Sequence, residues 1–290
     1  MRLRRRSQER LHHLLKLGSV VGSDFAMQPS SPDLFYSAKR RLDRANNRIS
    51  RLKDIVIAFV KKNPYAATQY MDTDGVTKVH AIKFTDRLDP VCEDIAAEAL
   101  LALRACLDQA AYATAVAAGK SKPTQTRFPI AGSATDLQNL LKGGICKHVP
   151  QDIVTFFCGL KPYKGGNDTL WTMNHMRNAI HTTFAPNGVV AGFNSITFLG
   201  GTPGFSGRMK GLNIVDPLRW DREKNEIAIF RADPGAHYPD IKIDFRFLIS
   251  FSDVVLNGSK DAVAILSAMA LEVQRVLLGT EEECHRLKLI

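Results

Sequence analysis

The sequence contains few cysteines, and none of them are spaced as a C-x-x-C pair. The five cysteines are an odd number spread over 290 residues, so a disulfide framework is excluded and no zinc-ribbon or redox motif is indicated. The H-E-x-x-H and G-x-S-x-G patterns and the P-loop pattern are also missing, which argues against zincins, α/β-hydrolases and P-loop nucleotidases. We therefore predict free or buried thiols in a reducing cytoplasm, and neither a metal site nor a cofactor.

Long hydrophobic runs are missing as well. Charged residues interrupt every apolar stretch before the roughly 18 residues that a membrane-spanning helix requires. The N-terminus begins with basic residues, but His12, His13 and Lys16 interrupt the apolar segment that a secretory signal would need. The sequence thus predicts no membrane span and no membrane partner.

Positive charge is the main compositional bias. Lys and Arg number 39 against 29 Asp and Glu, a net charge of +10, while hydrophobic residues make up 45%, as in ordinary globular proteins. Residues 1–26 hold six Lys or Arg and two acidic residues, and a Gln-Pro-Ser-Ser-Pro loop follows Met27. We expect a basic, flexible tail over 1–33 and a single compact domain over 34–290. A nucleic-acid arm is the functional interpretation of the tail, and a solvated extension is the simpler one.

Hydrophobic periodicity predicts helices in the first part of the chain. Apolar residues recur at three- and four-residue steps over 34–62, and Asn63-Pro64 ends that helix. An Asp-Gly pair between two β-prone runs, 67–71 and 77–84, predicts a hairpin. Asp89-Pro90 begins a second long helix, which extends to Ala118 and carries a buried stripe of small residues. Two short helices over 134–141 and 150–158 and a third substantial helix over 168–182 are also expected.

The period changes after residue 186. Runs rich in β-branched and aromatic residues cover 189–199, 212–215, 226–230 and 241–251, which favours an antiparallel sheet. A last helix is expected from a cap at Ser259 to Gly279. The predicted fold class is α+β: a helical N-terminal region with a β-hairpin insert (34–185), then an antiparallel sheet packed by a C-terminal helix (186–280).

Several ordered motifs resemble an uncharacterised family of bacterial cytoplasmic proteins. They are a long helix ending in Pro-Tyr, Leu-Arg-x-x-Leu-Asp at 103–108, Phe-Pro-Ile at 128–130, and Pro-Tyr-x-Gly-Gly-Asn-x-x-Leu-Trp at 162–171. The resemblance implies a shared fold and transfers no activity. This chain has Gln109 where the family usually has His, and 178–182 lack the family's Lys-His-Arg.

The segment Arg177-Asn178-Ala179-Ile180-His181 resembles the Arg-Asn-x-x-x-His motif of HEPN-type ribonucleases, one residue shorter. The resemblance implies metal-independent cleavage of RNA, with His181 as general acid or base, Arg177 binding phosphate and Asn178 orienting either group. Because such enzymes are usually dimeric, it also implies a homodimer. The alternative, which we favour, is a helix C-terminus whose Arg and His complement the helix dipole.

A second candidate cluster lies on the second long helix, where Arg104 and Asp108 form an i,i+4 pair. If the helix is buried, this pair needs polar partners, and Asn178, His181 or Tyr163 are the candidates. The cluster is then either a binding pocket or a structural network that locks the helices together. The glycine-rich segment 200–207 matches no nucleotide-binding motif and is interpreted as a flexible loop.

The sequence favours a non-enzymatic binding or regulatory protein of unknown ligand. Two alternatives stay open. One is the HEPN-like ribonuclease, and the other is binding of RNA or another nucleic acid without cleavage, through the tail and the Arg/Lys-rich first helix.

Overall fold

The computed structural model describes residues 33–180, 189–199, 212–214, 220–221, 224, 226–234, 242–251, 256 and 261–290. Apart from Asp33, all of these belong to one unit, Leu34–Ile290. The remainder of the predicted tail, the glycine-rich segment 200–207 and His181 lie outside the described residues.

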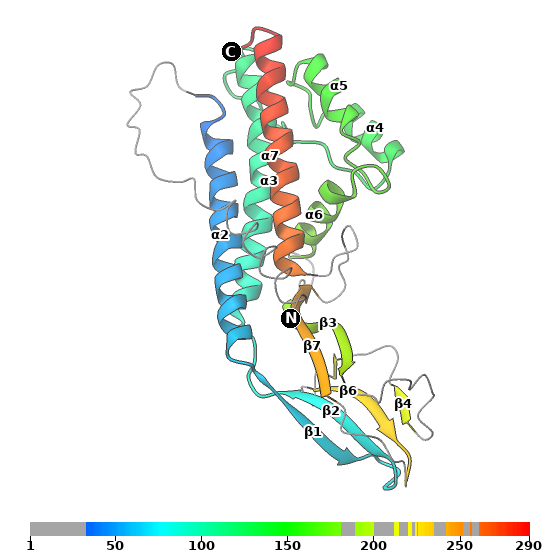
Figure 1. Cartoon of the computed structure of the whole chain (residues 1–290). Coiled ribbons are helices and arrows are strands. Elements are labelled where there is room, and N and C mark those ends of the chain that lie inside the picture. Colours follow the sequence, from blue (N-terminus) through cyan, green and yellow to red (C-terminus); the bar gives the residue numbers. More distant parts are fainter. Residues whose placement is uncertain are drawn as a thin grey trace, which may run out of the picture. The chain divides into compact units, whose positions relative to one another are not determined.

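Three long helices pack side by side (Figure 1): α2 (Tyr36–Lys61), α3 (Val91–Ala117) and α7 (Ala262–Arg286). The helix α3 lies at the centre of the hydrophobic core. The predicted small-residue stripe is confirmed, because every member is at most 4% exposed: Ala99, Leu103, Cys106, Leu107, Ala110 and Ala113. Small side chains on α3 let the backbones of its neighbours approach closely, which explains why it packs against both other long helices.

Three shorter helices follow α3 in the chain: α4 (Ala134–Lys142), α5 (Gln151–Gly159) and α6 (Asp168–Ala179). The hydroxyl of Ser133 caps α4 by accepting a hydrogen bond from the Asp136 backbone N–H at 3.1 Å. The helices α5 and α6 both contact α7, and α6 also contacts α3. Because α6 packs on α3, the residues near its end are brought close to the polar side chains of that core helix.

The C-terminal helix differs from its prediction at both ends. Its cap is Asp261, whose Oδ1 accepts a hydrogen bond from the Ala264 backbone N–H at 2.7 Å. The helix also continues through Gly279 to Arg286. Gly279 does not end the helix; a Cβ atom at this position would lie only 2.8 Å from Cζ of Phe156 on α5. The glycine therefore makes room for an aromatic ring.

By length and composition, α7 is also apolar enough to cross a membrane, and among the described residues it is the one helix of this kind. Its apolar side chains have packing partners in the protein. Ile265, Leu266, Met269, Val273 and Val276 are each at most 1% exposed and belong to the hydrophobic core. A central helix of a packed bundle has the same composition, so the core accounts for the apolar character of α7.

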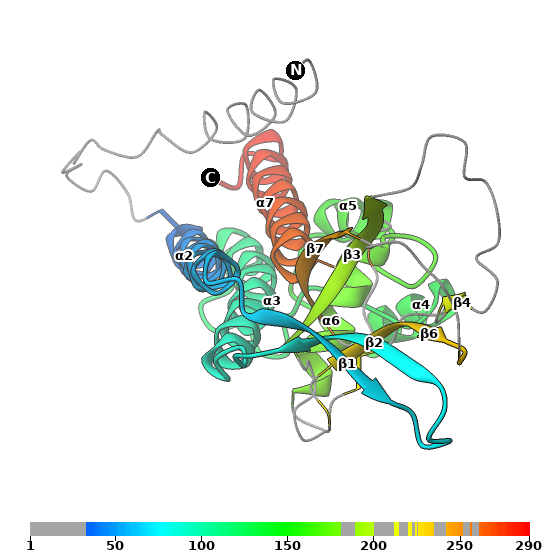
Figure 2. The ribbon, with the colours of Figure 1, turned by 60° about the horizontal axis from the view of Figure 1, so that its bottom comes forward.

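Two antiparallel sheets are formed by the described strands (Figure 2). The larger one has the order β1 (Tyr65–Met71), β2 (Lys78–Phe84), β6 (Glu226–Ala232) and β4 (Leu212–Ile214), and β5 (Trp220–Asp221) also pairs with β6. The smaller one pairs β3 (Val189–Leu199) with β7 (Lys242–Phe251). The α+β class is therefore confirmed. The predicted hairpin lies between α2 and α3 in sequence, and its second strand joins the larger sheet through β6.

Candidate functional site

Arg104 and Asp108 of α3 form an ion pair, with Arg104 Nη2 and Asp108 Oδ1 2.9 Å apart; the Arg104 side chain is buried and that of Asp108 is 27% exposed. Both side chains also bind the backbone of one residue in the loop that follows α3. Arg104 Nη2 donates to the Phe128 carbonyl oxygen at 2.8 Å, and the Phe128 backbone N–H donates to Asp108 Oδ1 at 3.1 Å. The pair thus holds the Phe128 backbone against the core helix.

Packing in the hydrophobic core holds Phe128 at this position. Its side chain is fully buried, and its ring centroid lies 4.8 Å from that of Phe157 on α5. The neighbouring residue is fixed as well, because the Arg127 backbone N–H donates to the Ile145 carbonyl oxygen at 3.1 Å. The loop is therefore held by the Phe128 ring and the Arg127 backbone, in addition to the two bonds from Arg104 and Asp108.

Arg177 comes to the same region from α6. The side chain of Asn167 caps α6 by accepting from the Leu170 backbone N–H, and its Nδ2 donates to Glu272 of α7 at 2.6 Å. This capped helix packs on both α3 and α7, and its buried residues are Leu170, Met173 and Met176. Arg177 is half-buried, and its Nη1 donates to Asn178 Oδ1 at 2.9 Å.

The charges in this region are unbalanced. Burial lowers the pKa of Arg104, the nearby charges of Arg177 and Arg127 lower it further, and only Asp108 acts in the opposite direction. Burial raises the pKa of Asp108, against the effects of Arg104, the Phe128 N–H, Arg127 and Arg177. Among the described residues, the region thus combines three guanidinium groups with one carboxylate. We call Arg104, Asp108, Arg127 and Arg177 the arginine cluster.

Two nitrogens of the arginine cluster are buried without a hydrogen-bond partner among the described residues. They are Nη1 of Arg104 and Nε of Arg177. A buried donor without an acceptor costs roughly 1–3 kcal/mol, and more when the group is charged. The cluster therefore has unused capacity to donate hydrogen bonds to an anion.

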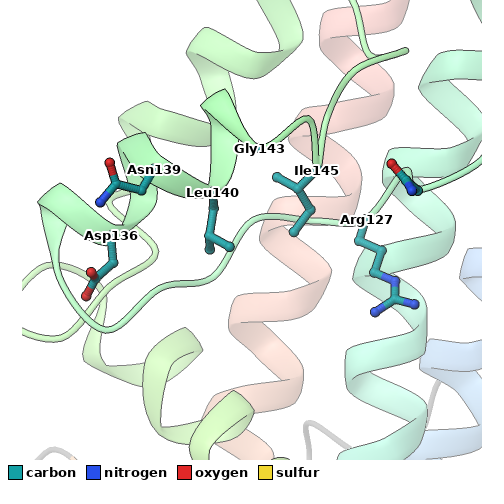
Figure 3. A pocket seen from close by; sticks show the side chains of 7 residues that line it. Arg127, Asp136, Asn139, Leu140, Gly143 and Ile145 are labelled. Carbon is teal, nitrogen blue, oxygen red and sulfur yellow. The ribbon is translucent and has the colours of Figure 1, made fainter.

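An open pocket of about 660 Å³ adjoins the cluster through Arg127. Figure 3 shows its two sides: Asp136, Asn139 and Leu140 come from α4, and Arg127 extends from the loop beside α3. Arg127 was not among the residues predicted from the sequence. Its position directly before Phe-Pro-Ile is the available signal, but nothing local indicates that this loop returns to α3.

The predicted site residues are only partly brought together. Arg104, Asp108 and Arg177 share the cluster, and Asn178 is bound to Arg177. Tyr163 was expected to pair with Arg104 or Asp108, yet the described residues show no hydrogen bond from its side chain to either. Instead Tyr163 forms a backbone bridge with Ala131. Because His181 is outside the described residues, the catalytic arrangement predicted for it stays a prediction.

A second basic region covers the exposed face of α2. Arg40, Arg44 and Arg51 recur at four- and seven-residue steps, so they project from one side of the helix, and all three are exposed. We call these three residues the α2 basic face. At its N-terminal end, Tyr36 is 59% exposed, and Cζ of Arg40 lies 5.8 Å from the centroid of its ring.

The cysteines offer no reactive thiol. All five are free, and four are buried. Burial raises the pKa of Cys106 and of Cys146 to about 12, and that of Cys92 and of Cys284 to about 11. Since the thiolate is the nucleophile, these four side chains stay protonated and inert at neutral pH.

Comparison with known proteins gave no further assignment: no family model, no curated protein and no solved structure matches this chain. The two arginine-rich regions are therefore the features from which a function is proposed.

Proposed function

We propose that this protein is a non-enzymatic binding module that binds nucleic acid through the α2 basic face. The supporting observation is the excess of positive charge on α2, which carries eight Lys and Arg residues against two Asp residues. Nucleic-acid phosphates attract such a surface without a shaped pocket, because counterions are released when basic side chains neutralise them. The net charge of +10 acts in the same direction.

The basic residues of α2 fall into two groups. Lys39 and Arg48 are partly buried and form ion pairs with Glu281 of α7 and Glu98 of α3. The α2 basic face has no ion pair with any of the described residues. Acidic partners therefore accompany the basic residues that face other helices, and the solvent-facing ones are left open to a ligand.

The spacing of the arginines on α2 lowers the stability of the helix. Arg40 and Arg44 are four residues apart, as are Arg44 and Arg48. Like charges at this spacing destabilise an isolated helix by roughly 0.2–0.5 kcal/mol per pair. The exposed side chains of Asp43 and Asp54 lie three residues from Arg40 and Arg51 and offset part of this repulsion. The remaining excess of basic residues supports a polyanionic ligand. The exposed ring of Tyr36 adds a surface on which a base can stack.

The test is the salt dependence of binding to labelled single-stranded RNA, measured by fluorescence anisotropy. The variant Arg40→Gln/Arg44→Gln/Arg51→Gln, called the α2 variant, should bind at least tenfold more weakly at low salt. Its slope of log K against log salt should be shallower by about 2, because each lost contact to a single strand removes about 0.7. Single-stranded DNA of the same sequence should behave alike, since phosphates carry no sequence information.

The matched control removes three exposed lysines elsewhere: Lys120→Gln/Lys122→Gln/Lys147→Gln. It changes the net charge by the same amount. If the control lowers affinity as much as the α2 variant, binding reflects net charge and no specific surface, and the proposal is wrong. If the wild-type protein does not bind either nucleic acid, the proposal is also wrong.

A HEPN-like ribonuclease is the second candidate function. The observation that favours it is the position of Arg177 inside a cluster with excess positive charge, where a phosphate could be held. The RNA used for binding also tests this candidate when it is incubated in EDTA. Cleavage by the wild type and none by His181→Ala would establish the ribonuclease, whereas intact RNA with both proteins would reject it.

A further inference from the structure

Among the described residues, the most deeply buried positive charge lies outside the α2 basic face. That charge belongs to Arg104, whose side chain is only 9% exposed. Its guanidinium has two terminal nitrogens with different surroundings. Nη2 contacts both Asp108 and the Phe128 carbonyl oxygen, while Nη1 has no hydrogen-bond partner among the described residues. One half of a rigid, fork-shaped donor is thus unused.

Arg177 supplies a second unused donor to the same cluster. Its Nη1 is committed to Asn178, and its buried Nε has no acceptor among the described residues. Arg127 differs from both, since its side chain is exposed and borders the open pocket between the loop and α4 (Figure 3). The cluster therefore extends from a buried guanidinium to a solvent-accessible one.

The net charge of the arginine cluster indicates which kind of ligand it would bind. Three guanidinium groups and one carboxylate leave two positive charges in the arginine cluster. The carboxylate of Asp136 also lines the pocket, but it lies on α4, on the opposite side from Arg127 (Figure 3), and its Oδ2 accepts a hydrogen bond from the Ser133 hydroxyl at 2.8 Å. A doubly charged anion with several acceptor oxygens would neutralise the excess and occupy the unused donors together. Guanidinium groups recognise phosphate oxygens through charge-assisted hydrogen bonds.

We propose that the arginine cluster is a binding site for a phosphate dianion, either inorganic phosphate or the terminal phosphate of a small phosphate monoester. Arg127 binds the anion where it enters from the pocket. Arg104 Nη1 and Arg177 Nε hold its oxygens at the buried end. Asp108 keeps the Arg104 guanidinium in position and does not contact the anion. This site is separate from the α2 basic face and does not rest on the proposed nucleic-acid function.

Isothermal titration calorimetry of the full chain in a phosphate-free buffer tests the proposal. Inorganic phosphate and glycerol phosphate are titrated separately at constant ionic strength, with chloride as the monovalent comparison. We expect saturable 1:1 binding of at least one dianion and none of chloride. Tighter binding of glycerol phosphate would assign the site to phosphate monoesters, and tighter binding of phosphate would assign it to the free ion.

Two variants locate the site. Arg127→Gln keeps the fold because its side chain is exposed, and Arg177→Gln removes the donor from α6. Each should weaken binding at least tenfold, since a hydrogen bond to a charged group contributes roughly 1.5–3 kcal/mol. The α2 variant should bind the dianion as the wild type does. The proposal is overturned if the wild type binds neither dianion, or if both single variants bind with wild-type affinity.

Discussion

The two arginine-rich regions of this protein use the same side chain in opposite ways. On α2, Arg40, Arg44 and Arg51 extend into solvent, and no described acidic residue pairs with them. Around Arg104, the guanidinium group is buried, bound to Asp108 and to the Phe128 backbone, and placed by the packing of α3. The first group can follow any polyanion, whereas the second can accept only an anion that fits a fixed geometry.

The number of arginines alone does not define a binding site. What matters is whether each guanidinium is buried and which hydrogen bonds it already makes within the protein. Exposed charges interact through water and are screened by salt within about 10 Å at 0.1 M. Buried charges are screened less and are costly unless they are paired. The α2 basic face should therefore determine salt-dependent affinity, and the arginine cluster should determine stability and anion selectivity.

The largest expected effect comes from removing Arg104. In Arg104→Met, Asp108 keeps only its bond from the Phe128 N–H, and the Phe128 carbonyl oxygen loses its donor. Breaking a buried pair in this way should lower the free energy of unfolding by about 3–5 kcal/mol. Arg44→Gln should change it by less than about 0.5 kcal/mol, as is usual for an exposed side chain. Urea unfolding measures both.

The double variant Arg104→Met/Asp108→Leu is the control for this prediction. It leaves no unpaired buried charge, so it should recover part of the lost stability. The recovery should be incomplete, because the Phe128 N–H and carbonyl oxygen both lose their partners. If Arg104→Met unfolds within about 1 kcal/mol of the wild type, the pair does not hold the loop as argued.

A smaller loss is expected from Asn167→Ala, which removes the cap of α6 and the bond to Glu272. The free energy of unfolding should fall by about 1–2 kcal/mol. Because α6 positions Arg177, phosphate binding should weaken as well, as calorimetry would measure. Asp74→Ala, which removes the side-chain acceptor of the Val76 and Thr77 backbone N–H groups in the turn between β1 and β2, is the control and should lower stability without weakening phosphate binding. Equal effects of the two variants on binding would contradict the placement of Arg177 by α6.

Arg44→Glu should separate stability from binding on α2. The substitution turns two like-charged i,i+4 contacts, with Arg40 and Arg48, into attractive ones. We expect the free energy of unfolding to rise by roughly 0.5–1 kcal/mol, while RNA affinity falls. Thermal unfolding and fluorescence anisotropy on the same samples provide the two readings. A variant that is less stable, or that binds RNA as the wild type does, would show that the positive charge of the α2 basic face is not maintained for a ligand.

The smallest effect is expected in the larger sheet, at a contact that lies outside both arginine-rich regions. Tyr70 donates a 2.5 Å hydrogen bond to Glu226. Burial, followed by this bond and the charge of Glu226, raises the pKa of Tyr70 from 10.0 to about 12. Because the pKa is raised on folding, the stabilisation is complete below pH 10 and is lost as the pH rises toward 12.

The stability advantage of the wild type over Tyr70→Phe should therefore shrink across this pH window, by at most about 1 kcal/mol. Denaturant unfolding at pH 9, 10 and 11 measures the difference between the two proteins. A constant difference would mean that the Tyr70–Glu226 contact does not favour the protonated phenol.

Periodicity predicted the helices well because helix formation depends on residues close in sequence. The helices α2 and α3 were placed to within about two residues at each end, whereas α7 continues beyond its predicted end at Gly279 to Arg286. The buried stripe of α3 was found from the spacing of its small residues. Gly279 was misinterpreted because its requirement for space comes from Phe156, more than a hundred residues earlier. The pairing of β2 with β6 has no local signal either, since the strands are separated by α3, α4, α5 and α6.

The candidate site was predicted in part for the same reason. The i,i+4 spacing of Arg104 and Asp108 is local, so their pairing could be anticipated. Their partner is a backbone peptide at Phe128, which no side-chain motif identifies. Arg127 came to the cluster through the same loop, and only the folded chain brings it near Arg177.

The most direct test of the central claim compares salt dependence between the two regions. RNA binding is measured over a salt series for the wild type, the α2 variant and Arg127→Gln/Arg177→Gln. We predict that the α2 variant loses about 2 from the slope of log K against log salt, while the double variant keeps the wild-type slope. The opposite result, with the slope lost in the double variant and kept in the α2 variant, would place nucleic-acid binding at the arginine cluster and contradict the account.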